Sequence, residues 1–219
     1  MSHLSRDRIV AAKKDIESFR PLEEFCAYSS ELINLMPSDQ FFVAAGMTFA
    51  RDAWIASRVA RGLDATRVRL VPDNWPDFEI EVDGTSISFE ATEVDLPDRR
   101  RSDEYRAVAA GTTPRMTHDP VEAWAARAAQ IPAALQTAAR SKAAKRYPPT
   151  ADLVIYLNID ERGIRHEQIV DDLSENTKEA SRAFRRVWVL WKATLYLVWD
   201  NGRLASLAVS LASDPELSP

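Results

Sequence analysis

The clearest pattern of apolar and polar positions along the chain lies between residues 76 and 94. Apolar and polar residues alternate there on both sides of Asp83-Gly84, and a period of two is typical of strands with one buried face. Asp-Gly between two such runs favours a two-residue hairpin turn. The pattern predicts two antiparallel strands whose phenylalanine and isoleucine side chains face the core.

Two helical patterns and a short strand precede this hairpin. Residues 5–36 are expected to be helical with a break at Pro21, and residues 41–61 to form a helix that ends at Gly62. Residues 67–71 are typical of a short strand.

A further helix is expected after an irregular loop over residues 97–118. Asp119-Pro120, with a glutamate three positions after the aspartate, favours a helix start in which Asp119 is the N-cap. This helix is expected to run to about Tyr147 with a bend at Pro132.

The last part of the chain alternates strands and a helix. Residues 151–159 are almost entirely apolar, as in a strand covered on both faces. Residues 166–186 are expected to be helical, and residues 187–207 to form further strands with a hairpin turn at Asn201-Gly202.

This element order predicts an α/β fold with a mixed central sheet. Its core is α-β-β-β-α-β, with helices on both faces, an extra N-terminal helix and extra C-terminal strands. The 219 residues fit a single domain. Its parts would be a helical segment over 1–40, the core over 41–160 and a C-terminal extension over 161–219.

Composition narrows the class of protein. With 46% hydrophobic and 28% charged residues the chain is globular, and its longest apolar runs are too short to span a bilayer. A single cysteine, Cys26, excludes an internal disulfide and a thiolate zinc cage. With no signal peptide visible, we expect a cytoplasmic protein that is not bound to membranes. Trp188 and Trp191 are expected in the core or at an interface between subunits of a homo-oligomer.

The net charge and the basic clusters of the chain indicate which kind of partner it can bind. The net charge of −5 argues against strong, nonspecific nucleic-acid binding. Basic clusters at 99–101 and 140–146 would be solvated surface unless they flank a site that handles phosphate.

Two acidic residues are brought together by the predicted hairpin. A two-residue turn at Asp83-Gly84 places Asp77 opposite Glu90, with Cβ atoms about 5 Å apart. Carboxylates at that separation either point into water or share a cation, and oxygen ligands suit Mg²⁺ or Mn²⁺. Glu79 and Glu81 lie on the same face, so the whole row could instead be a solvated edge.

The same residues resemble a known superfamily. Pro76-Asp77, a strand, a turn and Phe89-Glu90-Ala-Thr92 are similar to the signature of the PD-(D/E)XK nuclease superfamily, whose core is also α-β-β-β-α-β. The similarity extends over about residues 42–160. It implies that Asp77 and Glu90 bind Mg²⁺ or Mn²⁺, with Asp52 from the first core helix as a further acid.

The chain differs from the superfamily signature at one position. Where the signature has the catalytic lysine, this chain has Thr92. In some members of the superfamily the next helix supplies that lysine. Lys142 is the first candidate and Lys145 the second, and both could equally be surface lysines near a helix C-terminus.

Three interpretations follow. The first is a metal-dependent endonuclease or phosphodiesterase acting on DNA, in which Asp77 and Glu90 hold the ion and Lys142 assists. The second is the same fold without catalysis, used for protein binding or oligomerisation. The third is an unrelated α/β domain, because fold does not fix function.

Overall fold

The protein has a mixed α/β fold with parallel and antiparallel strands. The computed structural model describes residues 6–34, 48–71, 75–96, 107 and 119–211. The expected helical residues 35–36 and 41–47, and the expected loop over 97–118 apart from Ala107, lie outside these ranges. The eight strands follow one another in the sheet in chain order, β1 to β8. The chain divides into two compact units, and strand β4 passes from one into the other at residues 86 and 87.

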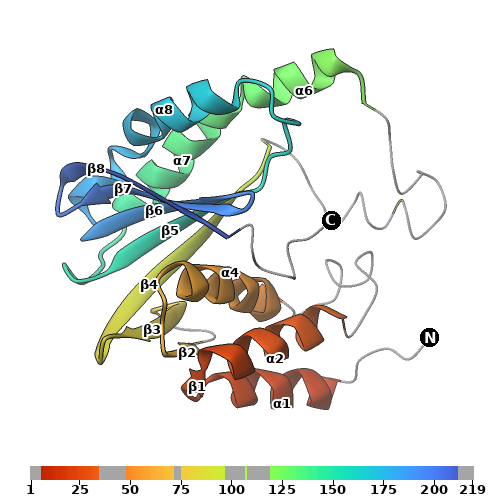
Figure 1. Ribbon diagram of the computed structural model, residues 1–219, viewed down its shortest axis with the longest axis vertical. Coiled ribbons are helices and arrows are strands. Elements are labelled where there is room, and N and C mark those ends of the chain that lie inside the picture. The colour runs from red at the N-terminus through yellow and green to blue at the C-terminus, as the bar shows by residue number, and fades with distance from the viewer. Residues whose placement is uncertain (1–5, 35–47, 72–74, 97–106, 108–118, 212–219) are drawn as a thin grey trace. The chain divides into compact units, whose positions relative to one another are not determined.

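The first unit contains the N-terminal helices and three short strands (Figure 1). Its elements are α1 (Arg6–Ile16), β1 (Arg20–Pro21), α2 (Leu22–Asn34), α4 (Thr48–Gly62), β2 (Arg67–Leu70) and β3 (Phe78–Val82). The predicted break at Pro21 is confirmed, although the sequence did not predict that Arg20 and Pro21 pair with β2. Strands β2 and β3 are antiparallel, with Leu70 opposite Phe78.

The hairpin turn is formed by Asp83 and Gly84, as predicted. Strand β3 ends at Val82 and β4 (Thr85–Val94) begins at Thr85, so the turn has two residues. The φ angles of Asp83 and Gly84 are 50° and 74°, and a type I′ turn requires positive φ at both central positions.

The alternation is confirmed along β3 and the first half of β4, and it ends at Glu90 and Ala91, which are buried as well as Phe89. The four residues predicted to face the core are all buried: Phe78, Ile80, Ile87 and Phe89.

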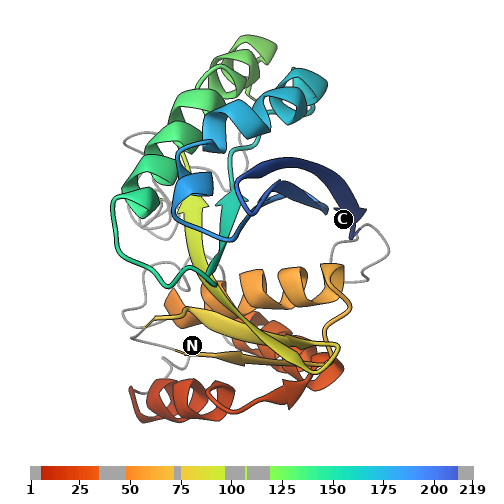
Figure 2. The ribbon, with the colours of Figure 1, turned by 90° about the vertical axis from the view of Figure 1, so that its left-hand side faces the viewer.

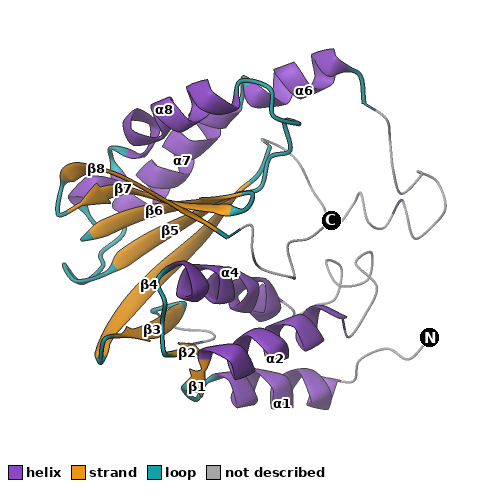
Figure 3. Ribbon diagram, viewed as in Figure 1, coloured by secondary structure: helices purple, strands orange, loops and turns teal. Residues whose placement is uncertain are grey.

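The second unit contains most of β4 and the C-terminal half of the chain. Its other elements are α6 (Val121–Ala128), α7 (Ile131–Ala143), β5 (Asp152–Leu157), α8 (His166–Thr177), a 3₁₀ turn η1 (Ala180–Arg182), β6 (Arg186–Trp191), β7 (Thr194–Asp200) and β8 (Arg203–Ser210). Strands β4, β5 and β6 are parallel, and β6, β7 and β8 are antiparallel. Figure 3 shows the helices and strands by type.

Helices α7 and α8 lie side by side over one face of the sheet in the second unit, with α7 against β5 and α8 against β7 (Figures 1 and 2). That face buries Leu153, Ile155 and Leu157 of β5 against the two helices. In the parallel register Glu90 lies opposite Leu153 and Thr92 opposite Ile155. Glu90 and Thr92 of β4 therefore share the face that the helices cover.

The last strands also follow the prediction. Asn201 and Gly202 form the β7–β8 turn with φ angles of 50° and 72°. Trp188 and Trp191 are each 1% exposed, which places both in the core. The indole nitrogen of Trp199 donates hydrogen bonds to α8 and so fixes β7 to that helix.

The expected helix over 119–147 was wrong in three respects, which are its continuity, its end and its cap. It is two helices, separated just before Pro132, and α7 ends at Ala143. Asp119 does not cap α6: the N-cap is Pro120, and no side chain caps the helix. The Asp119 carboxylate instead forms an ion pair with Arg127, in the last turn of that helix. No helix in the described ranges combines the length and the apolar character needed to cross a bilayer.

Asp152 is a fully buried acid at the start of β5. Its Oδ1 lies 2.8 Å from Arg185 Nε and its Oδ2 lies 2.9 Å from Arg186 Nε. Burial raises the pKa of Asp152 above its ordinary 3.8, and the two arginines do not fully offset this. An acid with a raised pKa in the folded state contributes stability below its unfolded pKa and loses it as pH rises.

We therefore expect a specific pH dependence of stability. The free energy of unfolding of the wild type, relative to Asp152→Asn, should fall as pH rises from 3.8 through the raised pKa, because an asparagine side chain does not ionise. Urea unfolding of both proteins over this range measures the difference. A difference that stays constant or increases with pH would contradict the assignment.

Candidate functional site

Glu90 and Lys142 form a nearly buried ion pair in the second unit. Lys142 Nζ lies 2.5 Å from Glu90 Oε1, and the two side chains are 14% and 10% exposed. The same amine donates a second hydrogen bond to the main-chain oxygen of Ala91, 3.0 Å away. The structure thus brings the predicted acid together with the first candidate for the missing lysine.

The spacing of residues along helix α7 explains why Lys142 faces the sheet. Ile131, Leu135 and Ala139 form the buried stripe of α7, and Lys142 follows Ala139 by three residues. Residues three and four apart share one helix face. Lys142 therefore continues the stripe that packs on the sheet, at the level where β4 presents Glu90.

Tyr147 completes the cluster, and sequence reasoning predicted no role for it. Its hydroxyl donates a hydrogen bond of 2.9 Å to Glu90 Oε1, the oxygen that Lys142 also contacts. Its ring packs against Phe184 at 4.7 Å between centroids. Two donors therefore hold one oxygen of Glu90 in a fixed position. The three residues Glu90, Lys142 and Tyr147 are called the Glu90 cluster below.

Thr92 and Lys145 are positioned differently from Lys142. Thr92, where the resemblance implies a lysine, is half-buried on the helix-covered face of β4 and carries no charge. Lys145 is exposed beyond the end of α7. No hydrogen bond or ion pair connects Lys145 to Glu90 in the described chain.

The remaining predicted acids, Asp52 and Asp77, lie together in the first unit. Both line a small pocket of about 50 Å³, together with Thr48, Lys13 and apolar residues. Asp52 is half-buried on α4 and accepts hydrogen bonds from Arg51. The main-chain oxygen of Asp77 accepts a hydrogen bond of 3.0 Å from Val71, which continues the β2–β3 ladder. These residues are called the acidic pocket below.

The predicted pairing of Asp77 with Glu90 stays a prediction, because the two residues belong to different units. Within the ranges that the structure describes, no three histidine, cysteine, aspartate or glutamate residues are grouped closely enough to hold a metal ion.

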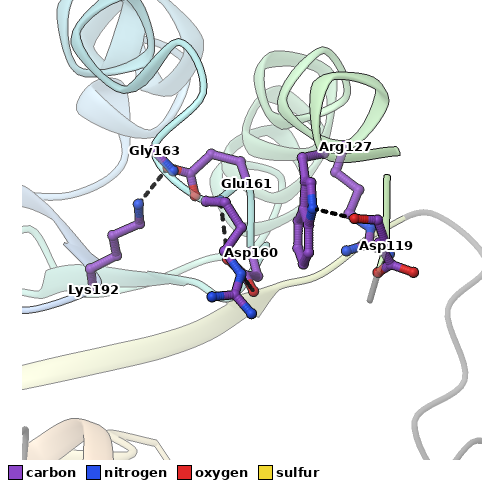
Figure 4. A network of polar contacts seen from close by, with 8 residues as sticks. Asp119, Arg127, Asp160, Glu161, Gly163 and Lys192 are labelled. Carbon is purple, nitrogen blue, oxygen red and sulfur yellow. Dashed lines mark hydrogen bonds and ion pairs between the residues drawn. The ribbon is translucent and has the colours of Figure 1, made fainter. Parts of the chain in front are cut away.

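A third buried acid, Glu161, was not predicted. It lies in the loop after β5 and is fully buried, with Oε1 2.5 Å from Lys192 Nζ and 3.0 Å from the main-chain nitrogen of Gly163. Figure 4 shows these contacts beside the Asp119–Arg127 pair. Each of the two acids, Glu161 and Asp119, has a basic partner, Lys192 and Arg127 respectively. We interpret it as a structural lock on the loop.

Comparisons of the chain with protein-family models, with curated proteins and with solved structures found no match.

The Glu90 cluster makes a prediction about stability. Lys142→Met leaves a buried carboxylate without its cation, which is expected to lower the free energy of unfolding by about 3–5 kcal/mol. The double variant Glu90→Gln with Lys142→Met should recover much of the loss, because no uncompensated charge remains. Lys145→Met is the matched control and should change stability by less than about 0.5 kcal/mol.

Urea unfolding of the three variants measures these values. Equal effects of Lys142→Met and Lys145→Met would show that the Glu90–Lys142 pair is not formed.

Proposed function

We propose that the protein is a metal-dependent nuclease that hydrolyses phosphodiester bonds in DNA. The observation that carries the proposal is the contact of the Lys142 amine with Glu90. The resemblance to the PD-(D/E)XK superfamily requires a lysine beside the second acid, and Thr92 cannot supply its charge. Lys142 provides a charged amine beside Glu90, although it comes from a distant part of the chain, and this supports the proposal.

The acidic pocket supports the metal part of the proposal. Asp52, Asp77 and Thr48, whose side chains carry carboxylate and hydroxyl oxygens, line a space of about 50 Å³. Small hard cations such as Mg²⁺ and Mn²⁺ prefer such ligands. Asp52 and Asp77 would bind the ion in this pocket, and Glu90 is the third metal-binding acid that the resemblance implies.

Each residue then has a defined task. The bound ion would polarise a phosphoryl oxygen and lower the pKa of a coordinated water. Lys142 supplies a positive charge that steadies the negative charge developing on the phosphate. Tyr147 and Lys142 both hold Glu90 Oε1, which fixes the orientation of the carboxylate.

The surface beside the Glu90 cluster suits a polyanionic substrate. No aspartate or glutamate occurs between Glu122 and Asp152, although the chain as a whole has a net charge of −5. Arg140, Lys145 and Arg146 are exposed in this stretch, next to Lys142. These side chains would contact backbone phosphates without reading base sequence.

A cleavage assay tests the proposal directly. The wild type should nick supercoiled plasmid or degrade single-stranded DNA in Mg²⁺ or Mn²⁺ and not in EDTA. Asp77→Asn and Glu90→Gln should each lose at least about 100-fold in rate, since removing one stabilising group commonly costs that much. Asp172→Asn, an exposed acid on α8, is the matched control and should keep full activity.

Equal cleavage by all four proteins would assign the activity to a contaminant and contradict the proposal. The absence of cleavage with every metal, together with no Mn²⁺ binding in calorimetry, would favour the second interpretation, a nuclease-like fold used for protein binding or oligomerisation. The threonine at position 92 is the observation that supports that alternative.

A further inference from the structure

A hollow lies between helix α8 and the last two strands of the sheet. It has a volume of about 250 Å³, and its lining is mostly apolar. Residues from three elements form it, among them Val170 and Asp171 of α8, Tyr196 of β7, and Leu204 and Ala208 of β8. All of them belong to the second unit, and none belongs to the Glu90 cluster. This hollow is called the α8–β8 groove.

Strand β8 forms the outer border of the groove and is the last strand of the sheet. Leu204 is 66% exposed and Leu207 is 51% exposed. From Leu204 to Ser210 the strand contains no charged residue and no proline. Edge strands of soluble proteins are normally guarded by such residues against pairing with another chain. Apart from Arg203 at its first position, this edge lacks such residues, and it lies beside an apolar hollow. These two features indicate a surface that pairs with another segment.

The helix side of the groove is acidic. Glu167 and Asp171 of α8, four residues apart on one face of the helix, are exposed, and neither forms an ion pair within the described ranges. Glu175 is a further acid of α8, and it pairs with Lys178. Asp171 itself lines the groove. The border opposite β8 therefore presents negative charge that no residue in the described part of the chain neutralises.

We propose that the α8–β8 groove binds an extended, basic segment of a partner protein. The segment would add to β8 as a further strand, with main-chain hydrogen bonds along the edge. An apolar side chain would enter the hollow near Ala208, which lies opposite Tyr196 on the helix-covered face. Lysine or arginine side chains on either side would approach Asp171. This binding does not depend on the nuclease activity.

Charge favours a partner segment over a second copy of this chain. A twofold pairing of β8 with itself keeps the same faces together, so the acidic α8 helices of both copies would lie on one side of the joined sheet. Like charges placed together across an interface are unfavourable. A basic segment meets the same surface with opposite charge.

A synthetic peptide tests this proposal with the full-length protein. The probe is fluorescein-labelled Lys-Thr-Lys-Val-Leu-Val-Lys-Thr-Lys, in which alternate positions give one face of lysines around a central leucine. Fluorescence anisotropy should show saturable binding that weakens with salt. The same peptide with glutamate in place of each lysine should bind at least tenfold more weakly to the wild type.

Paired variants locate the site. Asp171→Lys should weaken binding at least tenfold, and Asp172→Lys should change it by no more than twofold, although both alter the net charge equally. Ala208→Phe fills the hollow and should abolish binding. Circular dichroism confirms that each variant, all at exposed positions, is folded.

Three results would overturn the proposal. The first is equal affinity for the lysine and glutamate peptides, which needs no variant. The second is unchanged binding by Ala208→Phe or equal effects of the two charge reversals. The third is a dimer in sedimentation that Ala208→Phe dissociates, because a second copy would then occupy the groove.

Discussion

The Glu90–Lys142 pair is the contact on which the architecture of the second unit and the proposed chemistry both depend. A carboxylate on the face of β4 that the helices cover is costly to bury unless a cation and further donors satisfy it. Lys142 and Tyr147 supply these donors. The pair also connects α7 to the strand that carries the proposed metal acid, so the position of the helix and the orientation of Glu90 are determined together.

Local sequence signals were sufficient for much of the fold. Asp-Gly and Asn-Gly fixed both hairpin turns, because the backbone there needs positive φ angles that these residues tolerate. The apolar run over 151–159 predicted β5, which the parallel strands β4 and β6 flank. Asp119 shows where local rules fail. A longer-range ion pair with Arg127 takes the carboxylate that would otherwise cap the helix.

The candidate site was only partly accessible from the sequence. The resemblance selected Asp77, Glu90 and Lys142, and the stripe of α7 explains why Lys142 and not Lys145 reaches the sheet. Tyr147 lies 57 positions from Glu90, and no periodicity connects residues so far apart. The same holds for Lys13, which the fold places beside Asp52 and Asp77. Such partners become visible only when the chain is folded.

The stripe of α7 has a consequence for how this chain can vary. Successive residues of an α-helix are rotated by about 100° around the helix axis. Adding or deleting one residue between Ala139 and Lys142 would therefore rotate the Lys142 amine away from β4, even if every side chain were kept. The tract between these two residues is therefore constrained in length as well as in composition. Changes in loop length are better tolerated beyond Tyr147, where Pro148 and Pro149 are exposed and no helical phase has to be preserved.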